Sequence, residues 1–128
     1  MSDTLSATAP APLRTYYEIL LAGSDGYGQG DALRPLLSEH LDFTGALAGH
    51  IPNAREGFLR GAAGFVATVQ GVDFVCEAHD EQTSAVLYDA RMPGGRVRFA
   101  EFFTLREGVI ESLHLHYDGP DYLAKGGR

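Results

Sequence analysis

The two-residue periodicity of the second half of the chain is the feature that most constrains the fold. Apolar residues alternate with polar ones in four segments, at 72–78, 83–91, 96–105 and 109–117. The turn sequences MPGG and REG separate the last three segments. Because tight turns of this kind join antiparallel neighbours, we predict that residues 83–117 form an antiparallel meander, with 72–78 as a further strand.

The first half of the chain carries helical spacing instead. Apolar residues of segment 13–22 recur at the period of a helix, and Gly23 is a favourable stop. A second helix is predicted over 32–41, with Asp31 as its cap and Pro35 within its first turn. The glycine-rich stretch between these helices has neither a preceding strand nor a Lys. We therefore interpret it as a loop and not as a phosphate-binding site.

A third helix is predicted to begin at the sequence NARE. Asn53 and Glu56 have the spacing of a capping box, and an apolar stripe continues from there to about Gln70. A short extended piece is expected before it, at 42–49. Helices followed by a run of strands are typical of an α+β domain, in which the helices pack on a sheet.

Length and composition indicate a single domain. With 128 residues, of which 45% are hydrophobic, the chain can bury one core. We expect a disordered tail at 1–12, one domain over 13–123 and a loose C-terminus at 124–128. The single cysteine, Cys76, excludes an internal disulfide and is expected to be a buried, inert thiol.

Charge and hydropathy narrow the range of partners and cellular locations expected for the chain. The net charge of −7 disfavours a nucleic acid or an anionic membrane as a partner. No apolar run approaches the roughly 18 residues of a membrane span, and the N-terminus lacks the basic region of a secretory signal. We therefore expect a cytoplasmic protein. No cofactor-binding motif is visible in the sequence, so we expect no cofactor.

Two histidines and an aspartate alternate along the last predicted strand, in the sequence HLHYD. His114, His116 and Asp118 would share one face of that strand, opposite Leu113, Leu115 and Tyr117. Burying two imidazoles and a carboxylate without partners is costly, so the apolar set should face the interior. A metal site needs at least three converging ligands with supporting partners. We therefore expect no metal here, and the histidines should lie in water or in a subunit interface.

Several segments resemble the nuclear transport factor 2-like superfamily. The C-terminal AEFFTLREGVIESLHLHYD is similar to its characteristic ending, while YYEILLAG and DALRPLLSEHLDF resemble its first two helices. The likeness covers about residues 13–123 and points to the SnoaL-like and ketosteroid isomerase-like branch. It implies a cone-shaped α+β fold, with three N-terminal helices packed on a curved, mainly antiparallel sheet around a deep apolar pocket. It also implies a homodimer through the outer face of the sheet.

The same resemblance suggests which residues carry chemistry. Alignment with the ketosteroid isomerases places their first-helix tyrosine at Tyr16 and their pocket acid at Glu101. Their proton-abstracting carboxylate falls near Gly45, so that base is missing. The last-strand carboxylate of limonene epoxide hydrolase falls at Leu115, so its chemistry is not supported either. A glutamate in an apolar pocket would have a raised pKa and could act as a general acid–base.

Periodicity alone leaves the position of Glu101 open. One face of the third meander strand carries Phe99, Glu101 and Phe103. The other face, with Val97, Phe102 and, after a bulge or twist, Ala100, is also apolar. The resemblance favours Glu101 inside, and the alternative is an exposed glutamate. Tyr16 likewise either donates a hydrogen bond into the pocket or packs in the core with its hydroxyl at the rim.

Other residues besides Glu101 and Tyr16 are candidates for the functional site. His50 lies in a loop that borders the pocket mouth in the family and could act as a base near neutral pH. Either Tyr88 or Asp89 faces the cavity, and Asp89 is a reserve carboxylate. The side chains predicted to bind the substrate are Phe43, Phe65, Tyr88, Phe99, Phe103, Leu113, Leu115 and Tyr117.

Two functions remain open at this stage. The first is a SnoaL-like enzyme that performs cofactor-free proton transfer on an apolar small molecule, by isomerisation, cyclisation, dehydration or hydration. The second is a non-catalytic dimeric module that binds a hydrophobic ligand or a protein partner. The position of Glu101 separates them: burial against apolar walls with Tyr16 in reach favours the enzyme.

Overall fold

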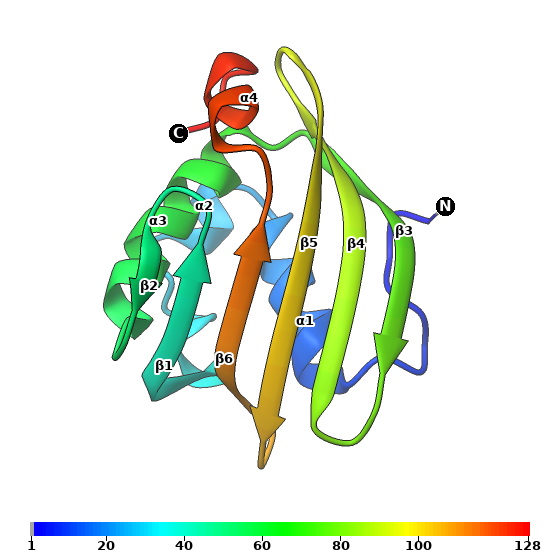
Figure 1. Ribbon diagram of the computed structural model, residues 1–128, viewed down its shortest axis with the longest axis vertical. Helices are drawn as coiled ribbons and strands as arrows, with labels where there is room; N and C mark the ends of the chain where they lie inside the picture. Colours follow the sequence, from blue (N-terminus) through cyan, green and yellow to red (C-terminus); the bar gives the residue numbers. More distant parts are fainter. Residues whose placement is uncertain (1) are drawn as a thin grey trace.

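The chain folds into a curved sheet with helices packed against one of its faces (Figure 1). The computed structural model describes residues 2–128. The helices are α1 (Ala11–Leu20), α2 (Ser24–Tyr27), α3 (Arg55–Thr68) and α4 (Gly119–Ala124), with a 3-10 turn η1 (Arg34–Leu36). The strands are β1 (Leu37–Gly45), β2 (Gly49–Ile51), β3 (Gly71–His79), β4 (Thr83–Met92), β5 (Gly95–Arg106) and β6 (Val109–His116). The predicted α+β class is confirmed.

The six strands form one sheet in the order β2-β1-β6-β5-β4-β3. Strands β3 to β6 make the predicted antiparallel meander, and β1 joins it by pairing in parallel with β6. The helices α1, α2 and α3 lie on one side of the sheet, and α4 lies across one end (Figure 1). Two strands precede α3, so the chain does not complete its helices before it starts the sheet. No helix within residues 2–128 combines the length and the apolar character that crossing a membrane requires.

The side chains of β6 face the sides of the sheet that the sequence predicted. Leu113 is fully buried, whereas His114 and His116 are exposed on the outer face. In β5 the buried residues are Val97, Phe99, Glu101, Phe103 and Leu105. The expected placement of Val97 opposite Glu101 is therefore wrong. The pairing of β4 with β5 is continuous, without the anticipated bulge, so alternate residues stay on one face along the whole strand.

The predicted helix over 32–41 is also wrong, because most of this segment is strand β1. The spacing of Leu33, Leu37 and Leu41, all buried, imitates a helical face. The strand bulges instead: Leu37 lies opposite Ile110, but Asp42 lies opposite Ser112. Residues four apart share one face of a strand, so Leu37 and Leu41 both point inward from an extended backbone as well.

Neither predicted cap is present. Helix α3 begins after Ala54 without a side-chain cap, and Asn53 has a left-handed backbone with φ of 50°. The amide oxygen of Asn53 contacts the Nδ1 of His40 at 3.0 Å, so it is not available to cap the helix. Asp31 accepts a hydrogen bond from Arg34 at 2.7 Å instead of capping a helix.

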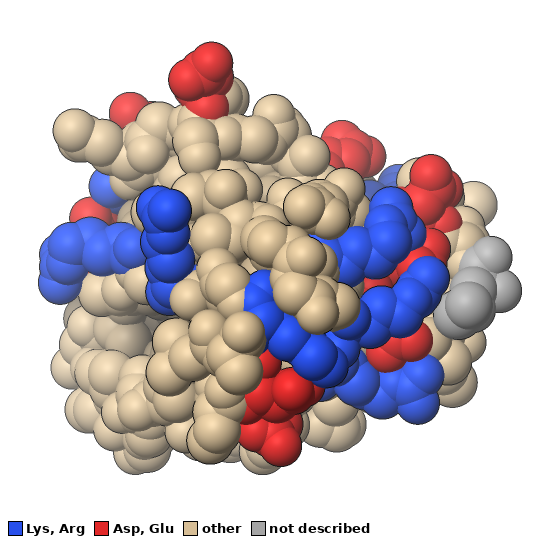
Figure 2. Space-filling view, turned by 90° about the horizontal axis from the view of Figure 1, so that it is seen from above, with Lys and Arg blue, Asp and Glu red and all other residues tan. Residues whose placement is uncertain are grey.

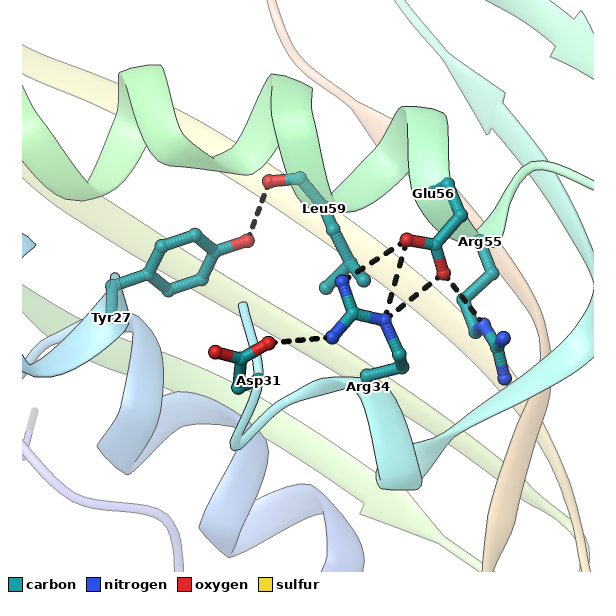
Figure 3. A network of polar contacts seen from close by, with 6 residues as sticks. All are labelled: Tyr27, Asp31, Arg34, Arg55, Glu56 and Leu59. Carbon is teal, nitrogen blue, oxygen red and sulfur yellow. Dashed lines mark hydrogen bonds and ion pairs between the residues drawn. The ribbon is translucent and has the colours of Figure 1, made fainter. Parts of the chain in front are cut away.

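A polar network ties the segment after α1 to α3 (Figure 3). The guanidinium of Arg34 bridges Asp31 and Glu56, and its hydrogen bonds are the main reason that the pKa of Glu56 lies below its usual value. The hydroxyl of Tyr27 donates to the carbonyl of Leu59 at 2.6 Å, and burial raises the pKa of Tyr27 to about 12. These contacts fix α3 over the sheet, where it forms one wall of a cavity.

The segments before α1 and after β6 both contact the sheet. Ser2 bridges to Phe74 of β3, and the N–H of Ser6 donates to the carboxylate of Glu77 at 3.1 Å. The expected disorder of residues 1–12, the first of which lies outside the described residues, and the expected looseness of residues 124–128 stay predictions. Asp118 caps α4 by accepting from the N–H of Asp121 at 2.9 Å.

Cys76 is exposed, so its expected burial is wrong. The register of β3 shifts beside Cys76 and turns its side chain outward.

The phase of β6 can be tested with two neighbouring substitutions. Leu113→Ala should lower the free energy of unfolding by about 2–5 kcal/mol, because it leaves a cavity in the core. His114→Ala should change it by no more than about 0.5 kcal/mol, because its side chain is exposed. Urea unfolding of both variants measures the difference. Equal losses in the two variants would contradict this strand phase.

Candidate functional site

A cavity of 280 Å³ lies between the inner face of the sheet and helix α3. Strands β1, β4, β5 and β6 and helices α1, α3 and α4 all contribute to its walls. Aromatic rings contribute much of the lining, among them Tyr16, Phe43, Phe65, Tyr88, Phe99 and Tyr117. Such a mostly apolar cavity with few polar groups is typical of a small-molecule site.

The carboxylate of Glu101 is the central polar group of this cavity. Its side chain reaches the lining from β5, and the residue is only 1% exposed. Three tyrosine hydroxyls donate to it. Tyr16 donates to Oε2 at 2.9 Å, while Tyr17 and Tyr88 donate to Oε1 at 2.9 Å and 2.6 Å. We call Glu101 and these three tyrosines the carboxylate cluster.

The fold brings the cluster together from three elements. Tyr16 and Tyr17 are consecutive in α1, so their side chains leave the helix about 100° apart. Both hydroxyls nevertheless reach the same carboxylate, because each bonds a different oxygen and the two rings meet edge to face at 4.9 Å. Tyr88 shares the inner face of β4 with Val86, which lies opposite Glu101. Helix α1 is thereby anchored to β4 and β5 through one side chain.

Burial and hydrogen bonding act in opposite directions on Glu101. Desolvation raises the pKa of its carboxyl above the usual value, while the three hydroxyl bonds lower it and leave a net increase. Desolvation, followed by the charge of Glu101, raises the pKa values of Tyr16, Tyr17 and Tyr88 well above 10. The tyrosines therefore keep their protons and act as donors.

The proposed second proton carriers lie away from this cluster. His50 is exposed in β2, does not line the cavity, and contacts Asp42 through Nε2 at 2.5 Å. Asp89 alternates with the inward-facing Tyr88 and pairs with Arg98 on the outer face, at 2.8 Å and 3.1 Å. Figure 2, which looks onto the end of the molecule near α4, shows acidic and basic side chains interleaved on one side. The structure does not bring His50 or Asp89 together with Glu101.

The ring of Phe43 packs against Gly45, the position that the alignment assigns to the missing base. Gly45 lines the cavity, as its alignment with the isomerase base suggested. A Cβ at this residue would lie 2.7 Å from Cζ of Phe43. No carboxylate could therefore project from position 45 unless Phe43 moved.

Most of the predicted substrate-binding residues do line the cavity. The exceptions are Phe103 and Leu113, which are buried behind it, with Phe103 packed edge to face on Tyr16 at 5.4 Å. The sequence analysis missed the hydroxyl of Tyr17, because helical geometry allowed only one of the two tyrosines to face the pocket. It also missed Tyr122 and Arg128, which line the cavity from α4 and the residues after it.

The polar residues of the HLHYD sequence lie on the outer face of β6 and at the start of α4. His114 and His116 stack on the outer face with ring centroids 6.4 Å apart, and Asp118 caps α4. Within residues 2–128, no three His, Cys, Asp or Glu side chains converge closely enough to hold a metal ion.

Comparisons with known proteins identify the fold. No protein-family model and no curated protein match the sequence. A putative ketosteroid isomerase from Kribbella flavida superposes with a TM-score of 0.69 at 15% identity, over 91% of this chain and 82% of that one. An NTF2-like protein of unknown function from Cytophaga hutchinsonii gives 0.62 at 18% identity, over 92% of this chain and 99% of that one.

A third structure has a ligand in its description. It is a hypothetical protein with a ketosteroid isomerase-like fold from Catenulispora acidiphila, in complex with trimethylamine. It superposes with a TM-score of 0.67 at 16% identity, over 92% of this chain and 93% of that one. The chain described here therefore has the NTF2-like, ketosteroid isomerase-like fold that its sequence resembles, and at these identities the likeness concerns the fold alone.

The hydrogen bonds of the carboxylate cluster can be tested one at a time. Tyr17→Phe removes a donor that stabilises the ionised form, so the pKa of Glu101 should rise further. It should also cost about 1.5–3 kcal/mol of stability at neutral pH, as expected for a hydrogen bond to a charged group. Carbon-13 NMR of the labelled Glu101 carboxyl gives the pKa, and urea unfolding gives the stability.

A matched control is Tyr27→Phe. It also removes a buried tyrosine hydroxyl bond, but that hydroxyl donates to Leu59 and not to the cluster. The pKa of Glu101 should stay unchanged in this variant. If Tyr17→Phe leaves that pKa unchanged or lowers it, the hydroxyl does not donate to an ionised Glu101.

Proposed function

We propose that the protein is a small-molecule enzyme that moves a proton on an apolar substrate without a cofactor, with Glu101 as the acid–base. Isomerisation, cyclisation, dehydration and hydration are reactions of this class. The observation that carries the proposal is a carboxyl group 1% exposed in the wall of a mostly apolar cavity. Desolvation there raises the pKa of Glu101. A carboxyl whose pKa is moved toward neutrality is a better proton carrier near pH 7.

A single carrier defines the mechanism. His50 and Asp89 lie outside the lining of the cavity, so Glu101 would both remove the proton and return it. The substrate would present a C–H bond to Glu101 while the rings of the cavity exclude water. General acid–base catalysis by one positioned group contributes about 10²–10⁴-fold to a rate.

The second candidate is binding without chemistry. Both oxygens of Glu101 already accept hydrogen bonds, so the carboxylate has less basicity to offer than an unbonded one. A protein of the same fold is in complex with trimethylamine, which is a small organic amine. A pocket that holds such a molecule and performs no reaction is therefore the alternative to the enzyme.

Hydrogen exchange on a simple substrate can test the enzyme proposal. Incubated in D₂O with small C–H acids such as cyclopentanone and 2-methyl-1-pyrroline, the protein should speed deuterium uptake next to the C=O or C=N group. Glu101→Gln should lower the acceleration by about 100-fold or more, because the proton carrier is removed. Proton NMR follows the loss of the exchanging signal.

Two further variants control this experiment. His50→Ala and Asp89→Asn should keep the full exchange rate, because neither side chain lines the cavity. If no C–H acid is exchanged by the natural protein, the enzyme proposal fails and the binding role takes its place. A loss of exchange in His50→Ala would show that the loop histidine carries the proton after all.

We also propose that the protein is a homodimer through the outer face of the sheet and that it acts in the cytoplasm. The outer face carries Phe102, which is 47% exposed and contacts the ring of His116 at a centroid distance of 5.7 Å. The exposed ring gives a second sheet an apolar surface to pack on, as in stacked antiparallel sheets.

The dimer can be tested with a charge on that face. Phe102→Glu should lower the self-association constant measured by sedimentation, because two carboxylates would meet at the interface. Leu123→Glu, which alters another exposed apolar residue on α4, is the control and should leave association unchanged. A protein that is monomeric at all concentrations would rule this interface out.

A further inference from the structure

The hydrogen bonds of the carboxylate cluster favour the ionised form of Glu101. With Glu101 ionised, each of the three tyrosine hydroxyls donates to it, and no buried polar side-chain atom within the described residues lacks a partner. Hydrogen bonds donated to a carboxyl stabilise its charged form, so the cluster favours the negative charge. A proton on Glu101 would occupy the one acceptor position that the tyrosines leave open.

The cluster also uses up the donors that an anionic substrate would need. Stabilising an enolate or another oxyanion requires hydrogen-bond donors aimed at the substrate oxygen. Tyr16 and Tyr88 line the cavity, but their hydroxyls already donate to Glu101 at 2.9 Å and 2.6 Å. A developing oxyanion would meet a carboxylate instead of donors, and the two negative charges would repel each other.

One acceptor position of the carboxylate remains open. An ionised carboxylate offers about four lone-pair positions, and the cluster fills three of them. Oε1 accepts from two tyrosines and Oε2 from one, so the free position is on Oε2. Glu101 can therefore accept one more hydrogen bond, from a donor inside the cavity.

The walls of the cavity favour a positive charge as well. The face of an aromatic ring is negative and attracts cations, most strongly when both are desolvated. Tyr16, Tyr88, Phe99 and Tyr117 line the same cavity as Glu101. Arg128 is the one basic residue in the lining, and it is exposed, so its charge is screened by water.

From these observations we infer that the ligand of this cavity is an organic cation, a protonated amine or imine whose N–H⁺ donates to Oε2 of Glu101 while its apolar body packs among the rings. The inference rests on the proposed function in taking this cavity as the substrate site, and it names the substrate class. It accounts for a carboxylate that is buried, accepts three hydrogen bonds and is one hydrogen bond short of full coordination.

A protonated imine also suits the single proton carrier. The C–H bond next to the C=N⁺ group would replace the N–H at the open position of Oε2, and Glu101 would take the proton from that carbon. The C–H electron pair would form a C=C bond, and the C=N π pair would move onto nitrogen, giving a neutral enamine. Return of the proton to carbon restores the cation. Positive charge is removed in this step and no oxyanion forms, so the missing oxyanion donors are not needed.

Binding of three ligands of one shape tests the charge preference. Cyclohexylammonium, cyclohexanol and cyclohexanecarboxylate differ mainly in charge, and calorimetric titration at pH 7.5 compares them. The cation should bind at least 10-fold more tightly than the alcohol, and the carboxylate should bind least. Equal affinities, or preference for the carboxylate, would overturn the inference.

Substitutions test whether Glu101 causes the preference for the cation. In Glu101→Gln the cation should lose its advantage over the alcohol. Glu111→Gln removes the same charge from the half-buried partner of Arg106, outside the cavity, and should keep the advantage. If Glu101→Gln does not fold, Tyr17→Phe replaces it, since Tyr17 does not line the cavity. That variant should lose cation affinity at a higher pH than the natural protein, because the pKa of Glu101 rises.

The pH profile can be assigned to Glu101 because few other groups face it. The titratable or charged side chains of its surroundings are Tyr16 and Tyr17 on α1, Tyr88 on β4, Tyr117 after β6, and Tyr122 and Arg128 from α4 onward. Tyrosine and arginine both titrate well above neutral pH. A fall in cation affinity on acidification therefore reports protonation of Glu101, and an affinity that is constant down to pH 4 would overturn the inference.

Deuterium exchange separates this inference from the proposed function. If 2-methyl-1-pyrroline exchanges faster than cyclopentanone relative to the uncatalysed rates, and Glu101→Gln abolishes the effect, both are supported. Exchange of the ketone alone would overturn the cationic substrate and leave the proton-transfer function standing. Tight binding of the cation without any exchange would support the ligand class and overturn the enzyme.

Discussion

The interaction on which this structure depends is the burial of the Glu101 carboxylate among three tyrosine hydroxyls. An unpaired charge in an apolar interior costs several kcal/mol, so the fold must supply donors wherever it buries one. It does so from α1 and β4, and the same bonds fix the helix against the sheet. Packing and chemistry are therefore coupled at this point, because a shift of α1 would withdraw two donors from the carboxylate.

The other elements of the fold form the cavity that Glu101 lines. The bulged strand β1 pairs in parallel with β6 and places the ring of Phe43 against Gly45, the position that the resemblance assigns to the isomerase base. The network around Arg34 and Glu56 holds α3 above the sheet, and α4 closes one end (Figures 1 and 3). The result is a mostly apolar cavity with the buried carboxyl of Glu101 in its wall.

That arrangement differs from a pocket built to stabilise an oxyanion. Tyr16 and Glu101 occupy the positions that the resemblance assigns to an oxyanion hole, yet they bond to each other and do not both point at a ligand. The same two residue types thus provide an anionic site in place of two donors. An organic cation can bond to the carboxylate and pack against the aromatic rings. The proposed chemistry follows because the site offers a negative charge where an oxyanion hole offers hydrogen-bond donors.

The sequence by itself determined the meander, the α+β class and the phase of β6, because alternation and turn residues are local signals that burial enforces. It also indicated Glu101 and Tyr16 through the resemblance. Only the tertiary structure decided that residues 37–41 are strand, that Val97 shares a face with Glu101, and that His50 and Asp89 lie elsewhere. It also decided that Tyr17 and Tyr88 complete the cluster. Bulges and meetings between distant side chains depend on contacts made across the whole fold, which no local pattern of residues encodes.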